Sequence, residues 1–343
     1  MSDGARPGMP PAAPAPWQVW SALGIVYVVW GSTYLAIRIM VETVPPLLGA
    51  GLRFGLAGAL MLLFLAARGH RVRVTRAELV GAGLVGVALC FGGNGLVTVA
   101  ERDVPSGLAA LIVASIPLFI VVYRLLAGDR PAAATLAGVL VGFAGVGVLL
   151  LPGGRPEDVP LGPTLLIVLA ASLWALGSFG AQRLTMPSAP LVSTGWQMLV
   201  GGGAMLVCAV PAGELSGLDV SRFSADSVAA FAYLVIAGSL VAFTAYAWLL
   251  QRAPISQVST YAYVNPVVAV VLGALILDEQ IGWPMLAGTA LVLPAVAVIV
   301  RREAAARRDA AREAAGAHGA AEPPDPAPAS AAGGAVEPAV ARR

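Results

Sequence analysis

The sequence predicts an all-α integral membrane protein with ten transmembrane helices, built as two inverted five-helix repeats. Of its 343 residues, 58% are hydrophobic and 12% are charged, whereas soluble domains have roughly 45–50% and about 25%. The apolar residues form blocks of roughly twenty, the length that a helix needs to cross about 30 Å of hydrocarbon. In lipid each block must satisfy its own backbone hydrogen bonds, so the blocks are expected to be helices. In addition, one pattern of prolines and glycines occurs twice, with five blocks in each copy.

The predicted spans follow one another with short connections. They cover approximately residues 18–38, 46–67, 78–99, 105–127, 132–151, 161–183, 190–211, 227–250, 255–277 and 283–302. Residues 1–17 are Pro/Ala-rich and are expected to be a flexible leader. They lack the basic region and short apolar core of a cleaved signal peptide, so the first apolar block is expected to be a permanent span. Residues 152–160 form a Pro/Gly-rich linker. Residues 303–343 are expected to be a cytoplasmic tail, helical at first and then disordered.

The internal repeat divides the membrane region into residues 18–151 and 161–302. An offset of 149 residues maps one pair of prolines onto another, and an offset of 144 maps four earlier positions onto later ones. The pairs are Pro105/Pro254, Pro117/Pro266, Trp30/Trp174, Pro46/Pro190, Arg53/Gln197 and Gly58/Gly202. Because each copy holds an odd number of spans, the second copy must lie upside down in the membrane. Transporters built this way place their substrate site near the midplane between the repeats.

The distribution of arginines predicts the orientation, since basic loops favour the cytoplasmic side. With both termini inside, the inner loops carry most of the basic residues: Arg68, Arg71, Arg73, Arg76, Arg130, Arg183 and Arg252. The outer loops hold fewer arginines and most of the acidic residues. We therefore expect a multi-pass protein of the cell (inner) membrane with both termini cytoplasmic.

Arg53 is the only ionisable residue well inside a predicted span. A charge at that depth is costly, at least about 2.5–3.5 kcal/mol on insertion scales, and is by default a functional-site hypothesis. One interpretation has Arg53 facing a central cavity, where it meets an anionic group such as a substrate carboxylate. The alternative has its long side chain reaching the outer interface. Its repeat equivalent, Gln197, keeps a polar group at the matching place and favours the cavity.

Other polar and aromatic side chains within the spans are candidates for the walls of such a cavity. Trp30 and Trp174 lie near mid-span, where an interfacial aromatic belt would not place them. Each polar candidate also has a structural alternative, because hydroxyls and amides in spans often bond to their own helix or to a neighbour. The remaining substrate-binding candidates are Ser32, Tyr34, Asn94, Ser178, Tyr246, Tyr261 and Asn265.

Two further roles can be placed on the sequence. Pro117 and Pro266 are expected to kink the fourth and ninth spans, and paired kinks suit helices that rock open and shut. No carboxylate lies deep inside a predicted span, so a proton relay has no obvious carrier. Glu101, at the end of the third span, is the nearest coupling candidate. This favours facilitated export or exchange, with proton-coupled multidrug export as the alternative.

Several short motifs, taken in order, resemble the EamA-type permeases of the drug/metabolite transporter superfamily. They are Trp30-Gly31-Ser32, Arg53, the run from Val104 to Ile112, Pro117-Leu118-Phe119, Tyr263-Val264-Asn265-Pro266-Val267 and Asp278-Glu279. The resemblance covers residues 18–302. It implies a ten-helix fold with a central cavity and alternating access, usually serving export of amino acids or other small metabolites.

Other classes of protein are disfavoured by what the sequence lacks. Because it contains no lysine, it cannot hold a GxxxxGK[ST] nucleotide-binding loop. It has no His/Cys cluster for a catalytic metal, so we expect no enzyme, cofactor or metal. A receptor or non-transporting membrane subunit would carry large soluble loops, which are missing. The expected partners are a small-molecule substrate and the lipid bilayer, with no nucleic acid, in a monomer or homodimer.

Overall fold

The computed structural model describes residues 15–150 and 159–320, and every regular element in these ranges is a helix. The first repeat holds α1 (Pro16–Met40), α2 (Pro46–Ala67), α3 (Arg76–Gly86), η1 (Val87–Gly95), α4 (Leu96–Ala100), α5 (Ser106–Val113), α6 (Ile116–Leu126) and α7 (Ala133–Leu150). The second holds α8 (Leu161–Gly180), α9 (Pro190–Ala209), η2 (Val220–Arg222), α10 (Ala225–Tyr233), η3 (Leu234–Val241), α11 (Ala242–Arg252), α12 (Ile255–Val258), α13 (Tyr261–Ile276) and α14 (Trp283–Ala320).

These elements form ten membrane spans. In the described ranges, nine helical segments are long and apolar enough to cross a bilayer, and Tyr261–Ile276 is a shorter apolar helix. The predicted ten-helix membrane fold is therefore confirmed. One compact unit ends at Ala304, and α14 continues as helix to Ala320. Most of the predicted leader and linker, and the end of the predicted tail, lie outside the described residues.

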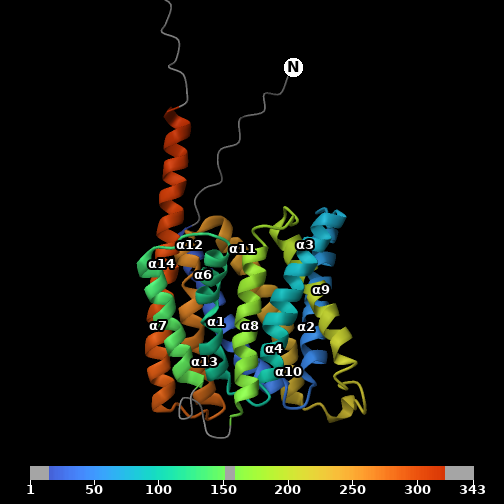
Figure 1. Cartoon of the computed structure of the whole chain (residues 1–343). Coiled ribbons are helices and arrows are strands. Elements are labelled where there is room, and N and C mark those ends of the chain that lie inside the picture. The colour runs from blue at the N-terminus through green and yellow to red at the C-terminus, as the bar shows by residue number, and fades with distance from the viewer. Residues whose placement is uncertain (1–14, 151–158, 321–343) are drawn as a thin grey trace, which may run out of the picture. The chain divides into compact units, whose positions relative to one another are not determined.

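The spans run side by side, and their connections gather at two ends (Figure 1). The arginine-rich end carries Arg68, Arg71, Arg73, Arg183 and Arg252. The acidic end, at the bottom of Figure 1, carries Glu42, Glu101, Asp103, Glu214, Asp278 and Glu279. Both ends are made by turns from both repeats, because consecutive spans cross in opposite directions.

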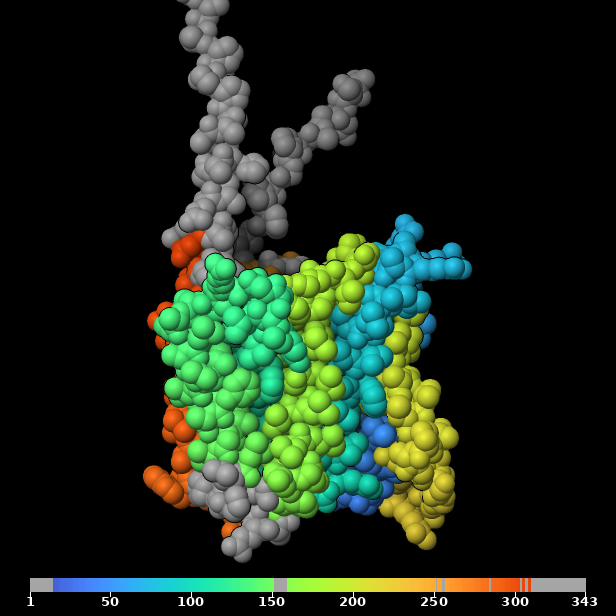
Figure 2. Space-filling view, in the orientation of Figure 1, coloured from blue at the N-terminus to red at the C-terminus, as the bar shows by residue number. Residues whose placement is uncertain are grey.

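The outer surface of the bundle is apolar. Figure 2 shows α7, α8 and α9 on one face of the molecule. Large exposed side chains on these helices include Leu140, Leu165 and Val207. In water such a surface would be an association site, but in a bilayer it is the surface that lipid tails cover.

The inverted repeat is visible where the two equivalent helices α2 and α9 cross. A Cβ at Gly58 would lie 2.7 Å from the Gly195 carbonyl oxygen, and a Cβ at Gly202 would lie 2.9 Å from that of Gly51. Gly51 and Gly195 are equivalent by the same 144-residue offset that relates Gly58 to Gly202. The later glycine of α2 therefore meets the earlier glycine of α9, and the earlier one of α2 meets the later one of α9. The two helices thus cross in opposite chain directions, as a two-fold axis in the membrane plane requires. Small residues at this crossing let the backbones touch.

The third span of each repeat has a wider π-helical segment at its centre. These are η1 and η3, which start 147 residues apart, at Val87 and Leu234. A tryptophan from the opposite repeat packs against each one. Trp174 lies against Gly93 of η1, and its equivalent, Trp30, donates from Nε1 to the Gly238 carbonyl of η3 at 3.3 Å. Single π-turns often mark functional positions in helices, and the sequence reading did not foresee these.

The fourth and ninth spans are both interrupted, but at different places relative to their prolines. The fourth breaks at Ala114–Ser115, just before Pro117, between α5 and α6. The ninth breaks at Ser259–Thr260, between α12 and α13, whereas Pro266 lies inside α13. A proline in a helix lacks the N–H that would bond the carbonyl four residues earlier. In the fourth span α5 ends at Val113, the residue whose carbonyl lacks this bond, while α13 continues past Pro266.

Candidate functional site

Arg53 lies inside the bundle, with 3% of its surface exposed. Its Nε donates to the Ser239 hydroxyl at 3.0 Å, and its guanidinium carbon lies 4.6 Å from the centre of the Phe54 ring. The bond to Ser239 is the one hydrogen bond of the Arg53 side chain found among the described residues. A guanidinium has five N–H donors in a planar fork, so donors remain for an anionic ligand. The fork matches the two oxygens of a carboxylate.

Trp30 is the centre of an aromatic cluster, made of Trp30, Phe243, Tyr246 and Tyr261. The Trp30 ring centroid lies 5.1 Å from those of Phe243 and Tyr246 and 5.2 Å from that of Tyr261. The two tyrosine rings are 5.6 Å apart and nearly perpendicular. Aromatic faces of this kind attract apolar groups and cations.

The segment η3 joins the guanidinium to the aromatic cluster. Gly238 accepts the Trp30 indole N–H, and the next residue, Ser239, accepts the Arg53 Nε–H. A Cβ at Gly238 would lie 3.3 Å from Arg53 Nη2 and 3.1 Å from Thr33 Cγ2. We call Trp30, Arg53, Gly238, Ser239, Tyr246 and Tyr261 the η3 site. It combines an anion-binding group with an apolar, aromatic wall, which suits a small amphipathic ligand.

Some of the predicted site residues bond within their own helix. The Ser32 hydroxyl donates to Val29 O at 2.9 Å and shares a 2.6 Å hydrogen bond with the Tyr233 hydroxyl. The Ser178 hydroxyl donates to Trp174 O at 2.9 Å, and Gln197 Nε2 donates to Ser193 Oγ at 2.9 Å. The Ser32–Tyr233 bond joins α1 to α10. The others are the local kind that hydroxyls and amides often make inside spans.

The remaining predicted residues lie on η1, α8, α1 and α13. Asn94 is half-buried in η1, and Trp174 packs on the same segment. No contact found in the described residues joins these two to Arg53. Tyr34 packs against the core around α5. Asn265 is buried, and its Oδ1 has no partner among the described residues.

Sequence reasoning missed Gly238, Ser239 and Phe243. The available signal was weak: Gly238-Ser239 is the only small, partly polar pair in the run Leu234–Val241. Nothing in the sequence shows that Ser239, 186 residues from Arg53, would meet it.

Comparison with known proteins identifies the family. The EamA-like transporter family model matches residues 18–151 and 162–301. The chain belongs to this family.

Similar proteins are named as transporters. The uncharacterised inner membrane transporter YedA of Escherichia coli (strain K12) is 40% identical over 257 residues, covering 74% of this chain and 81% of YedA. A probable amino-acid metabolite efflux pump of the same strain is 26% identical over 276 residues, covering 78% of this chain and 90% of that protein. A solved crystal structure with 23% identity covers 84% of this chain and 99% of its own, with a TM-score of 0.56, and shares the fold. The resemblance drawn from the motifs is confirmed, and this EamA-like protein is a multi-pass transporter of the inner membrane rather than an enzyme.

At the acidic end of this EamA-like transporter, two glutamates tie the repeats together. Glu214 accepts the backbone N–H groups of Leu47 at 3.1 Å and Leu48 at 2.8 Å, in the first turn of α2. Glu279 accepts those of Ser106 at 2.7 Å and Gly107 at 2.9 Å, in the first turn of α5. We call these contacts the two clamps.

The clamps supply helix caps that the local sequence lacks. The residues before α2 and α5 are Pro45 and Pro105, which have no side-chain acceptor. The first N–H groups of a helix need acceptors, and a negative charge there is favourable. A left-handed residue precedes each clamp glutamate, Gly213 with φ 75° and Asp278 with φ 52°. These turns end α9 and α13 and direct the carboxylates towards the other repeat.

Removing one clamp should destabilise the protein modestly. We expect Glu279→Ala to lower the free energy of unfolding by about 1 kcal/mol, within the ~0.5–2 kcal/mol that the loss of a helix cap costs. Thermal melting of the purified protein in detergent would measure the change. Gln280→Ala, at the exposed next position, is the matched control. Equal melting temperatures for the two variants would show that the cap contributes nothing.

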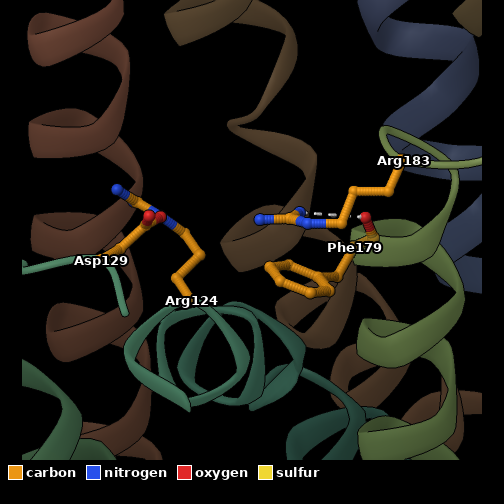
Figure 3. Close-up of polar contacts among 4 residues, drawn as sticks. All are labelled: Arg124, Asp129, Phe179 and Arg183. Atoms are coloured by element: carbon orange, nitrogen blue, oxygen red, sulfur yellow. Dashed lines mark hydrogen bonds and ion pairs between the residues drawn. The ribbon is translucent and has the colours of Figure 1, made fainter. Parts of the chain in front are cut away.

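The arginine-rich end is built differently. In Figure 3, Arg124 pairs with Asp129 at 2.9 Å, and Arg183 lies over the Phe179 ring, 3.6 Å from its centre. Asp129 is the repeat equivalent of Asp278 by the 149-residue offset. The helix starts equivalent to those of α2 and α5 are the starts of α9, at Pro190, and of α12, at Ile255. Among the described residues, no acidic side chain caps either of these two starts. The two ends are therefore held by different contacts, although the helices around them are symmetric.

Proposed function

We propose that this EamA-like transporter exports small metabolites that carry a carboxylate, such as amino acids, across the inner membrane. The observation that carries the proposal is the buried guanidinium of Arg53 beside the aromatic cluster. A buried cation is expensive unless a partner compensates it. Arg53 has one neutral partner, Ser239, and an incoming carboxylate would supply the missing negative charge.

The aromatic cluster would hold the rest of the substrate. The rings of Trp30, Tyr246 and Tyr261 contact one another, and Trp30 is bonded to Gly238 of η3. Their faces would accept an apolar side chain or an ammonium group. A ligand with a carboxylate at one end and such a group at the other would touch both halves of the η3 site.

The movement we propose is alternating access by rocking of the two repeats about the η3 site, as in other inverted-repeat carriers. The arginine-rich end would face the cytoplasm, with both termini on that side, because basic loops stay inside. Export is the direction supported by the similarity to a probable amino-acid metabolite efflux pump.

Transport by the purified protein in proteoliposomes tests this proposal. The vesicles would be loaded with labelled L-amino acids, or with cationic dyes, and efflux followed with and without a pH gradient. We expect efflux of at least one amino acid above that of protein-free vesicles. Dye efflux that needs a pH gradient, with no amino-acid efflux, would replace the proposal with proton-coupled multidrug export.

A further inference from the structure

Glu101 is a buried acid without a partner. It follows Ala100, the last residue of the third span, and 0% of its surface is exposed. Neither carboxylate oxygen has a hydrogen-bond partner among the described residues. An ionised carboxylate in such a place would carry a large desolvation cost.

The two arginines that act electrostatically on Glu101, Arg38 and Arg53, form no ion pair with its carboxylate in the described part of the chain. Arg38 Nη1 donates instead to backbone carbonyls, to that of Glu101 itself at 2.6 Å and to that of Arg102. The Nε of Arg53 is bonded to Ser239. No ion pair to Glu101 is found in the described part of the chain.

A second carboxylate, that of Glu279, acts electrostatically on Glu101. Glu279 accepts two N–H groups at the start of α5. When two carboxylates lie near each other in a buried place, one of them holds its proton. Burial first, and then the Glu279 carboxylate, raise the pKa of Glu101 well above its ordinary value, while Arg38 and Arg53 oppose this.

Two hydroxyl-bearing residues, Tyr34 and Ser106, also bear on this end of the bundle. The Tyr34 hydroxyl of α1 lies near enough to interact electrostatically with Glu101. Ser106, which starts α5, has a buried hydroxyl without a partner among the described residues. The charged and titratable groups that act on Glu101 are thus Arg38 and Tyr34 from α1, Arg53 from α2 and Glu279 from the turn after α13.

We propose that Glu101 is a proton-binding site, occupied while the acidic end is closed and emptied to water when that end opens. On opening, the O–H bond of the carboxyl breaks, the proton passes to water, and the carboxylate becomes hydrated. Because the proton binds the closed form more tightly, protonation and closure favour each other. The proton site goes beyond the proposed function, while the opening step rests on its alternating access.

Infrared spectroscopy of the purified full-length protein tests the proton site without any substrate. At neutral pH we expect a carboxylic-acid C=O band that is lost in Glu101→Gln, shifted in Glu101→Asp, and unchanged in the control Asp103→Asn. Glutamine imitates the protonated acid, so Glu101→Gln is expected to fold. A spectrum in which Glu101→Gln loses no such band would overturn the proposal, whatever the transport assay shows.

The pH dependence of stability gives a second readout. Because its folded-state pKa is raised, Glu101 contributes stability that is fully present below its unfolded-state pKa. That stability is lost as the pH rises through the folded-state value. The melting temperature should therefore fall with rising pH, and Glu101→Gln should remove this part of the slope. An unchanged slope in Glu101→Gln would contradict the proton site.

Hydrogen exchange tests the link to closure. The Ser106 and Gly107 amides are bonded to the Glu279 clamp, so they report whether the acidic end is closed. At one alkaline pH, we expect these amides to exchange several-fold more slowly in Glu101→Gln than in the wild type. Equal exchange in the two proteins would leave Glu101 as a proton site but refute its link to closure.

Discussion

Replacing Arg53 with alanine is expected to reduce transport of carboxylate-bearing substrates strongly while leaving the folded protein in the membrane. The variant would lose the proposed hydrogen bonds between the Arg53 guanidinium and the substrate carboxylate. Hydrogen bonds to charged groups contribute about 1.5–3 kcal/mol. At about 1.4 kcal/mol for each factor of ten, transport should fall roughly 10- to 100-fold or more. Efflux from proteoliposomes at matched protein content measures the change.

Two further variants separate binding from structure. Arg53→Lys keeps the charge but loses the planar fork, so it should restore transport only in part. Arg68→Ala is the matched control, since Arg68 ends the same helix α2 and lies over the Phe64 ring at 5.0 Å, away from the η3 site. Normal efflux from Arg53→Ala at unchanged expression would remove Arg53 from the substrate site.

A methyl group at Gly202 is expected to disrupt the crossing of α2 and α9. Its Cβ would lie 2.6 Å from Gly55 N and 2.9 Å from Gly51 O. Both are backbone atoms of α2, so relief requires the two helices to move apart. Overpacking in a tightly packed interior costs typically about 1–3 kcal/mol, and occasionally more. We expect Gly202→Ala to lower the melting temperature and the yield of folded protein.

The neighbouring glycine provides an internal control. A Cβ at Gly203 would meet nothing within 4 Å, and the same holds for Gly55 on the facing helix. Gly203→Ala and Gly55→Ala should therefore melt as the wild type does, or slightly higher, because alanine favours the helix over glycine. If Gly202→Ala and Gly203→Ala melted alike, the close crossing of the two repeats would be refuted.

Much of the fold could be predicted from the sequence because membrane helices are local. Each of the ten blocks has the length and apolarity to span the bilayer and satisfies its own hydrogen bonds. The predicted spans therefore agree closely with the helices, for example 46–67 with α2 and 190–211 with α9 (Pro190–Ala209). The equivalence of Gly58 and Gly202 was also visible, since a repeat leaves its mark on residue spacing.

The candidate site was predicted only in part. Arg53 stood out because a charge inside an apolar block is rare, and Trp30 because of its depth in the first span. Their partners, Gly238 and Ser239, carry no comparable signal. They meet Trp30 and Arg53 because η3 packs against α1 and α2. The break in the ninth span lies at Ser259–Thr260, which no proline or glycine marks in the sequence.

The sequence by itself thus determined the membrane class, the ten spans, the repeat and the one charge within them. These follow from hydrophobicity and from spacing along the chain. Only the tertiary structure decided that Glu214 and Glu279 cap helices in the other repeat and that Glu101 lies buried without a partner. Each clamp joins residues more than 160 positions apart. Which polar groups meet at the end of a bundle depends on how its helices pack, and local sequence patterns do not record that packing.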